Sequence, residues 1–108
     1  MIQQIRPEEL AAKLRSGESI YLLDVRQPEE HHYCHLADSL LIPLPELTAR
    51  LGEVKPPEGA LVVVYCHHGI RSLSAAAMIQ NAGHENVASL SGGIDAWSAR
   101  IDPSVPRY

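Results

Sequence analysis

The sequence predicts an open α/β fold, in which helices lie on both faces of a mainly parallel sheet. Strand-like apolar runs alternate along the chain with segments of helical spacing, which is the pattern of this fold class. The run at residues 60–65 is continuously apolar and rich in β-branched residues, as expected of a central strand covered on both faces. With 108 residues, of which 45% are hydrophobic, the chain can bury one core, so we expect a single domain at 1–108.

The first strand is expected at residues 2–5, and a helix follows it. Pro7 fits the first turn of a helix, and with the acidic residues after it begins an amphipathic segment that ends at Gly17. Residues 20–23 then predict a buried strand that ends at Asp24.

Short elements are expected in the middle of the chain. Residues 28–30 begin with proline and predict a brief helical turn, and residues 40–42 predict a short strand. Prolines stop that strand, and three leucines at helical spacing predict a second short helix. These leucines are Leu44, Leu47 and Leu51. The run at 56–59 then breaks the chain before the central strand.

The second half of the chain completes the predicted fold. Small residues at helical spacing predict a helix that begins at Ser72, lies close to the sheet and is capped by Gly83. Residues 87–90 predict the last strand, and Ser91-Gly92-Gly93 predicts a tight turn. A final helix at 95–100 can bury the single tryptophan of the chain.

The central strand leads directly into a loop that begins with a cysteine, Cys66. Amides that converge at a helix N-terminus, together with a neighbouring cation, lower a cysteine pKa from about 8.5 into the range of about 3.5 to 7.5. Arg71 supplies the cation. In open α/β sheets ligands bind beyond the carboxyl ends of the strands, where Cys66 and the corner at 24–26 both lie. The sequence therefore predicts a reactive thiolate at Cys66.

Five blocks of sequence carry a family resemblance. They are Leu23-Asp24-Val25-Arg26 with Pro28-Glu29-Glu30, His35-Leu36, Ile42-Pro43-Leu44, the loop from Cys66 to Ser72, and Gly92-Gly93 with Trp97. In this order and at these intervals they make the chain resemble the single-domain rhodanese family of sulfurtransferases over essentially its whole length. The resemblance implies a rhodanese-like sheet and no metal or organic cofactor. The tail at about 102–108 resembles that of rhodanese domains fused to activating enzymes of small sulfur-carrier proteins.

The resemblance also implies a reaction and roles for the residues. Cys66 attacks the outer sulfur of a donor such as thiosulfate and becomes a persulfide, and an acceptor thiol, cyanide or partner protein then removes that sulfur. Two half-reactions predict ping-pong kinetics. The loop that stabilises the persulfide consists of His67, His68, Gly69, Ile70, Arg71 and Ser72. Arg71 holds an anionic donor or fixes the loop, and Asp24 and Arg26 support the site from outside it.

The length of the loop separates two chemistries that occur in this fold. Four residues lie between Cys66 and Arg71, which is the spacing of sulfur-transferring rhodaneses. Related dual-specificity phosphatases and arsenate reductases have one residue more, because a tetrahedral anion needs more amides around its oxygens. The loop therefore favours sulfur transfer over phosphatase or arsenate reductase activity.

The segment at 34–39 departs from the family, where Gly-His-Ile-Pro-Gly-Ala is common. If the replaced glycines have positive φ, Cys34 and Asp38 each bear a steric cost of about 1 kcal/mol. Cys34 is either an inert buried cysteine or a resolving thiol that attacks the Cys66 persulfide.

Histidines gather at 31–35 and beside the nucleophile, and they permit two further hypotheses. One is a zinc site, although the spacing matches no standard motif and hydrogen-bonded or solvated histidines are the favoured explanation. The other is that His67 and His68 point outward and favour anionic donors when protonated. Thiosulfate binding is then expected to weaken as pH rises through about 6.5.

Composition and charge exclude other classes of function. The net charge is −4 and the nine lysines and arginines are scattered, so nucleic-acid binding is not expected. We also expect no membrane partner, because no apolar run approaches the roughly 20 residues of a membrane helix. Without a signal segment at the N-terminus, a soluble cytoplasmic protein is the simplest interpretation.

Two alternatives to a small-molecule sulfurtransferase use the same fold. One is a protein-bound sulfur carrier that takes persulfide sulfur from a cysteine desulfurase and passes it to a relay partner. The other is a non-catalytic interaction module, which the presence of Cys66, Gly69 and Arg71 disfavours. The proline-rich tail either packs back across the sheet through Tyr108 or stays free in solution.

Overall fold

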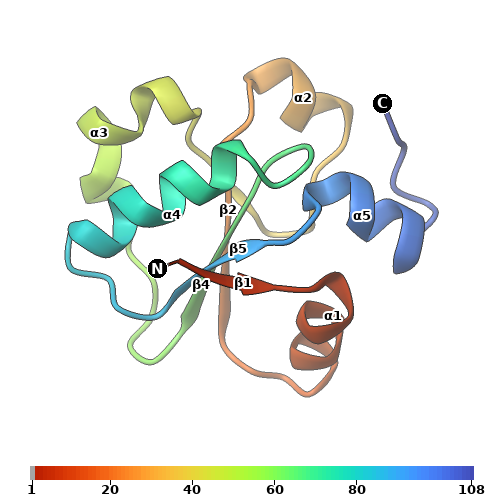
Figure 1. Ribbon diagram of the computed structural model, residues 1–108, viewed down its shortest axis with the longest axis horizontal. Helices are drawn as coiled ribbons and strands as arrows, with labels where there is room; N and C mark the ends of the chain where they lie inside the picture. The colour runs from red at the N-terminus through yellow and green to blue at the C-terminus, as the bar shows by residue number, and fades with distance from the viewer. Residues whose placement is uncertain (1) are drawn as a thin grey trace.

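A five-stranded sheet forms the centre of the computed structural model, which describes residues 2–108 (Figure 1). The strands are β1 (Gln3–Ile5), β2 (Ile20–Asp24), β3 (Leu40–Leu41), β4 (Leu61–Tyr65) and β5 (Val87–Leu90), in the order β1-β5-β4-β2-β3. Each neighbouring pair is parallel, so the carboxyl ends of all five strands meet at one edge. The predicted α/β class and parallel sheet are confirmed.

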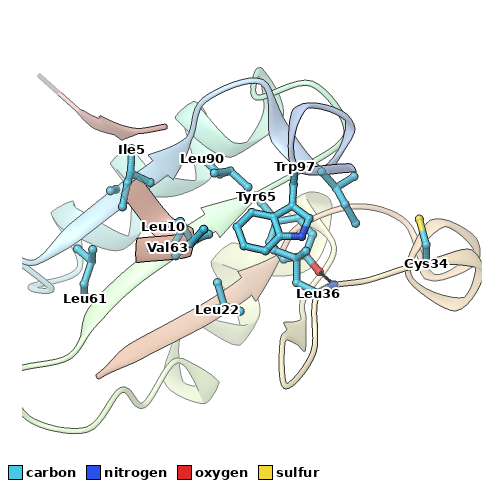
Figure 2. Packing of buried hydrophobic residues seen from close by; sticks show 13 residues of the cluster. Ile5, Leu10, Leu22, Cys34, Leu36, Leu61, Val63, Tyr65, Leu90 and Trp97 are labelled. Atoms are coloured by element: carbon cyan, nitrogen blue, oxygen red, sulfur yellow. Dashed lines mark hydrogen bonds between the residues drawn. The ribbon is translucent and has the colours of Figure 1, made fainter. Parts of the chain in front are cut away.

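Helices cover both faces of this sheet, as the sequence predicts. They are α1 (Pro7–Arg15), α2 (Pro28–Tyr33), α3 (Leu47–Arg50), α4 (Arg71–Asn81) and α5 (Gly93–Arg100). On one face, α1 and α5 pack over a cluster that includes Leu10, Tyr65 and Trp97 (Figure 2). On the other face, α3 and α4 pack over a second cluster that includes Val64 and Ile79.

Alternation along β4 decides where the loop that follows it places its cysteine. All five residues of β4 are buried, which agrees with a central strand covered on both faces. Val63 and Tyr65 belong to the α1–α5 cluster, whereas Val62, Val64 and Cys66 belong to the α3–α4 cluster. Cys66 therefore continues the α4 side of the strand beyond the edge of the sheet.

Several elements differ in extent from the expectation. The brief turn expected at 28–30 is a six-residue helix, α2, whose start is stabilised by Glu30 accepting a hydrogen bond from the Gln27 N–H at 3.0 Å. The helix expected around Leu47 is a single turn flanked by short 3-10 segments at Leu44–Glu46 and Leu51–Glu53. None of the helices within 2–108 is both long and apolar enough to cross a bilayer.

The strain expected at 34–39 is present at one of its two positions. Asp38 has a φ of 63°, so it adopts the left-handed conformation that a glycine would adopt at lower cost. Cys34 has a φ of −161°, which is extended backbone that any residue adopts. The cost expected at Cys34 is therefore wrong, because the end of α2 needs no left-handed residue there.

The tail packs against the domain instead of remaining free. Val105 packs on the α1–α5 cluster and accepts a hydrogen bond from the Ser98 hydroxyl. Arg107 forms an ion pair with Asp95 at 3.0 Å. These contacts bring Tyr108 to the carboxyl edge of the sheet, beside α2 and the cysteine loop.

Candidate active site

Cys66 lies directly after β4, with a residue exposure of 1%. Its Sγ accepts a hydrogen bond from the Gly69 N–H at 3.1 Å and faces the Ser72 hydroxyl oxygen at 3.6 Å. Burial alone would raise the pKa of this thiol. Hydrogen bonds from Ser72 and Gly69, together with the charge of Arg71, more than offset burial and hold the pKa below its usual value. The cradle therefore favours a thiolate.

The loop turns at Gly69, where the backbone has a φ of +96°. A Cβ at this position would lie 3.0 Å from the Gly92 nitrogen and 3.2 Å from the Leu90 carbonyl oxygen. Glycine alone fits this conformation and this close approach without strain. The turn is what aims the Gly69 N–H back at the Cys66 sulfur.

The N-terminus of α5 donates hydrogen bonds to the first two residues of the loop. The Ile94 N–H donates to the Cys66 carbonyl at 2.9 Å, and the Asp95 N–H donates to the His67 carbonyl at 3.1 Å. Gly93 has a φ of +62°, and a Cβ there would lie 2.4 Å from the His67 carbonyl oxygen. The sequence predicts a turn at Gly92-Gly93 but not its contact with the cysteine loop, because that contact depends on strand order.

Ser72 links the loop to the neighbouring strand. Its hydroxyl lies 2.8 Å from the hydroxyl of Ser89 in β5, and both side chains are buried. Ser89 carries no functional signal in the sequence, since it lies inside an apolar strand. The pair fixes the Ser72 hydroxyl where it faces the cysteine sulfur.

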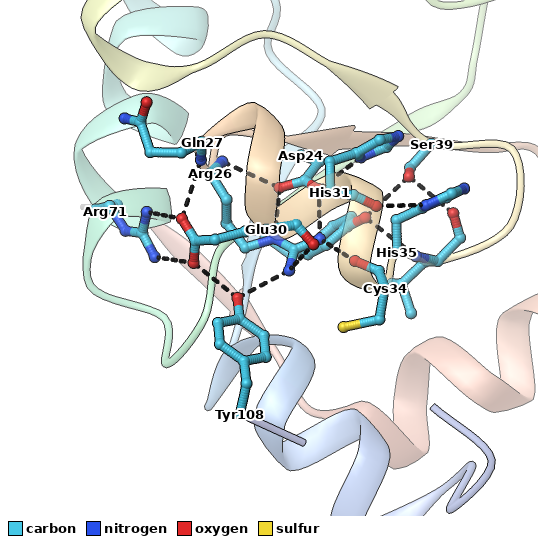
Figure 3. A network of polar contacts seen from close by, with 12 residues as sticks. Asp24, Arg26, Gln27, Glu30, His31, Cys34, His35, Ser39, Arg71 and Tyr108 are labelled. Carbon is cyan, nitrogen blue, oxygen red and sulfur yellow. Dashed lines mark hydrogen bonds and ion pairs between the residues drawn. The ribbon is translucent and has the colours of Figure 1, made fainter. Parts of the chain in front are cut away.

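Arg71 does not project freely towards solvent. Its guanidinium makes two hydrogen bonds to the Glu30 carboxylate of α2, at 2.8 and 3.0 Å (Figure 3). The Arg71 bonds are the main reason that the pKa of Glu30 is lowered to about 2. Of the two roles expected for Arg71, fixing the loop matches these contacts. Glu30 belongs to the family-like blocks, but it was not selected as a site residue.

Asp24 and Arg26 form a buried ion pair that supports α2 and the tail. Arg26 donates to both Asp24 oxygens, at 2.8 and 2.6 Å, and to the Cys34 carbonyl at 2.7 Å. Burial would lower the pKa of Arg26, but the bonds with Asp24 raise it above its usual range. His31 Nδ1 also lies 2.8 Å from Asp24. The side chains of this pair make no hydrogen bond to Cys66 within residues 2–108.

Tyr108 connects that ion pair with the cysteine loop. Its hydroxyl donates to Glu30 at 2.7 Å and accepts from Arg26 at 2.8 Å. Its ring stacks on His67, with centroids 3.8 Å apart and planes within 5°. The chain end expected either to pack or to stay free thus meets the loop directly.

His67 and His68 differ from one another in exposure. The His68 side chain is 60% exposed, as expected for an outward residue. His67 lies half-buried beneath Tyr108, and its Nε2 has no hydrogen-bond partner among residues 2–108. The outward orientation expected for His67 is therefore wrong. Burial and then the neighbouring His68 lower the pKa of His67, so its charge is lost below the pH range that the sequence suggested.

Cys34 lies away from the nucleophile. It belongs to the α1–α5 cluster, whereas Cys66 belongs to the cluster on the opposite face of the sheet (Figure 2). The Cys34 thiol contacts the Pro106 carbonyl at 3.4 Å. Of the nearby histidines, His31 and His35 stack on each other at 4.0 Å. Within residues 2–108, no three histidine, cysteine or acidic side chains form a group that could hold a metal.

Comparison with known proteins extends the resemblance to specific relatives. The family described as "Rhodanese-like domain" matches residues 6–100. A "Sulfurtransferase" from Allochromatium vinosum is 35% identical over 105 residues, which are 97% of this chain and 96% of that protein. The "Probable adenylyltransferase/sulfurtransferase MoeZ" of Mycobacterium tuberculosis is 36% identical over 104 residues, but this chain spans only 26% of its length.

The fold also matches solved structures. A rhodanese-related protein from Thermoplasma volcanium superimposes with a TM-score of 0.82 and 27% sequence identity. The match covers 98% of this chain and 99% of the other. The similarity therefore includes the complete sheet and the edge at which Cys66 lies.

Proposed function

This chain belongs to the rhodanese-like domain family, and we propose that it is a sulfurtransferase that carries sulfane sulfur as a persulfide on Cys66. The observation that carries the proposal is the environment of the Cys66 sulfur. A buried thiol receives a hydrogen bond from Gly69, faces Ser72 and lies within the field of Arg71, and its pKa is lowered despite burial. That combination stabilises a sulfur anion, as both the thiolate and the persulfide require.

The reaction consists of two displacements at sulfur. In the first, the Cys66 thiolate attacks the outer sulfur of thiosulfate, and the sulfur–sulfur bond of the donor breaks. Sulfite leaves with the electron pair, and Cys66 carries the persulfide. In the second, a thiolate or cyanide attacks the outer sulfur of the persulfide, and the Cys66 thiolate leaves. No net proton or electron is consumed when both nucleophiles are anionic.

The chain's own residues position and stabilise these anions. The Gly69 amide and the Ser72 hydroxyl are held in place by the turn and by Ser89, so they require little reorganisation during the reaction. Arg71 contributes a fixed positive charge, because its guanidinium donates two hydrogen bonds to the Glu30 carboxylate. The short loop and the small exposure of Cys66 suit a single sulfur atom better than a tetrahedral anion.

We propose thiosulfate or a low-molecular-weight persulfide as donor and a thiol, cyanide or a protein as acceptor. The name of the MoeZ relative joins sulfurtransferase to adenylyltransferase activity in one longer protein. A protein acceptor in a sulfur relay is therefore part of the proposal for this chain. The exposed Ile70, at the outer end of the loop with 78% of its surface accessible, offers such an acceptor an apolar contact beside the site.

The first test is intact mass after incubation with thiosulfate. Native protein is expected to gain one sulfur, about 32 Da, that a reducing wash removes and that cyanide releases as thiocyanate. Cys66→Ala is expected to gain none, while Cys34→Ser serves as the matched control and is expected to load as the native protein does. Loading of Cys66→Ala would contradict the assignment of the nucleophile.

Failure of thiosulfate to load the native protein would favour a different donor. The same mass measurement with a cysteine desulfurase and cysteine then tests the relay alternative. Sulfur that arrives only by this route identifies a carrier. Absence of sulfur from both routes would contradict the proposed activity and leave an interaction module.

A further inference from the structure

The Tyr108 hydroxyl lies between two groups of opposite charge. It donates a hydrogen bond to Glu30 Oε2 at 2.7 Å and accepts one from Arg26 Nη1 at 2.8 Å (Figure 3). Burial and the bond with Glu30 outweigh the influence of Arg26 and raise the pKa of Tyr108 to about 12, so the hydroxyl keeps its proton. A neutral hydroxyl can donate to one partner and accept from the other at once.

The Glu30 carboxylate is fully engaged by the residues around it. Oε1 accepts from Arg71 at 2.8 Å and from the Gln27 N–H at 3.0 Å. Oε2 accepts from Arg71 at 3.0 Å and from Tyr108 at 2.7 Å. Each oxygen thus accepts one hydrogen bond from Arg71 and one from a second donor, which holds the carboxylate in place. The bond from Tyr108 is the one that fixes Oε2.

The ring of Tyr108 is held as firmly as its hydroxyl. One face stacks on His67 at 3.8 Å, and Tyr33 of α2 meets the ring edge-on at 5.8 Å. Arg107, the residue before Tyr108, donates two hydrogen bonds to Asp95 of α5. Four separate parts of the fold therefore determine where the hydroxyl lies: α2, α5, the Arg26 corner and the cysteine loop.

We propose that Tyr108 is a positioning residue for Cys66: it fixes Glu30, and through Glu30 it fixes the Arg71 charge that stabilises the thiolate and the persulfide. The proposal rests on the function proposed above and extends it to a residue outside the loop. Tyr108 itself touches neither the sulfur nor an incoming donor in this role. Without its hydroxyl, Glu30 and Arg71 can reorient together, and the field at Cys66 weakens.

The pH midpoint of Cys66 ionisation measures this coupling directly. With cysteine labelled at ¹³Cβ, the NMR shift of Cys66 can be followed during titration and does not depend on access of a reagent to the buried sulfur. Tyr108→Phe keeps the stack on His67 and removes only the hydroxyl. We expect its Cys66 midpoint to lie about half a pH unit higher, and sulfur loading at a pH below both midpoints to be about threefold slower.

Tyr33→Phe is the matched control. It makes the same chemical change in the adjacent ring, and the Tyr33 hydroxyl has no hydrogen bond within residues 2–108. Its midpoint and loading rate are expected to equal those of native protein. The groups that also bear on these titrations are Arg26, Glu30, His67, His68 and Arg71. None of them is changed in either phenylalanine variant.

A double-mutant cycle tests whether Tyr108 acts on Cys66 through Glu30, as opposed to a general loosening of the fold. Glu30→Gln removes the carboxylate through which Tyr108 fixes Arg71. Adding Tyr108→Phe to this variant is therefore expected to shift the Cys66 midpoint little further. Unchanged midpoints in Tyr108→Phe, or fully additive shifts in the double variant, would overturn the inference. The titration needs no sulfur donor, so this result is independent of whether native protein loads sulfur.

Discussion

Glu30 is a single side chain that joins the start of a helix, the cysteine loop and the tail. It caps α2, pairs with Arg71 and accepts from Tyr108. These donors favour its ionised form, and the pair with Arg71 is the leading reason that its pKa is about 2. The depressed pKa means that ionised Glu30 stabilises the folded state relative to the unfolded chain.

Replacing Glu30 is therefore expected to have a pH-dependent effect on stability. The unfolded pKa is about 4.3, so the contribution is complete above that pH and is lost as pH falls towards 2. Glu30→Gln is expected to lower the free energy of unfolding by about 2 kcal/mol at pH 6, after allowance for partial exposure. Urea denaturation at pH 6 and pH 2.5 measures the difference, which is expected to shrink at the lower pH. A constant difference would contradict this account.

Whether a residue of the site could be predicted from the sequence depends on how far it lies from Cys66 along the chain. The loop from Cys66 to Ser72 could be selected from the sequence because its residues are contiguous and have a direct chemical meaning. Glu30, Ser89 and Tyr108 could not, since each reaches the loop only through the packing of distant elements. The orientation of His67 was missed for the same reason, because the residue that covers it is Tyr108.

At the scale of elements, the start of α5 has the strictest steric demand. Gly93 combines positive φ with backbone carbonyls of the cysteine loop at 2.4 and 2.5 Å from where a Cβ would lie. No flexible side chain can move aside there, because the obstructing atoms are main-chain atoms of Cys66 and His67. The glycine is required by contact between two elements as well as by its own conformation.

Gly93→Ala is expected to destabilise the protein by about 3 kcal/mol or more, since both the backbone strain and the clash must be relieved. The loop must shift, so sulfur loading of Cys66 is expected to fall as well. Gly52→Ala is the control, because nothing lies within 4 Å of a Cβ at Gly52. Thermal unfolding of both variants checks this; equal stabilities would contradict the steric argument.

Elements with a strong apolar pattern were predicted well, and those without one were not. The continuous apolar run at residues 60–65 predicts β4, and the spaced alanines predict α4. The six residues of α2 include no buried side chain, so periodicity carries no signal for its length. Its role in the site is to position Glu30, and that role depends on tertiary contacts and not on the sequence pattern.

At the scale of the whole molecule, the two thiols belong to separate packing clusters. Cys34 and Cys66 lie in clusters on opposite faces, and a disulfide needs Cα atoms within about 7 Å. This placement disfavours the resolving role considered for Cys34. Treatment of native protein with diamide is expected to give no intramolecular disulfide. Mass spectrometry checks this, and a monomer about 2 Da lighter that reverts on reduction would contradict it.

The sheet order has a further consequence for how the protein is made. Cys66 is synthesised before β5, the Gly93 turn and Tyr108, which shape the surroundings of its loop. The first strand, β1, must also wait for β5 before it can pair. Until then the loop lacks its contacts with Ser89, α5 and Tyr108, which hold it in the folded protein. Translation thus delays the acidic cysteine until the domain that controls it is complete.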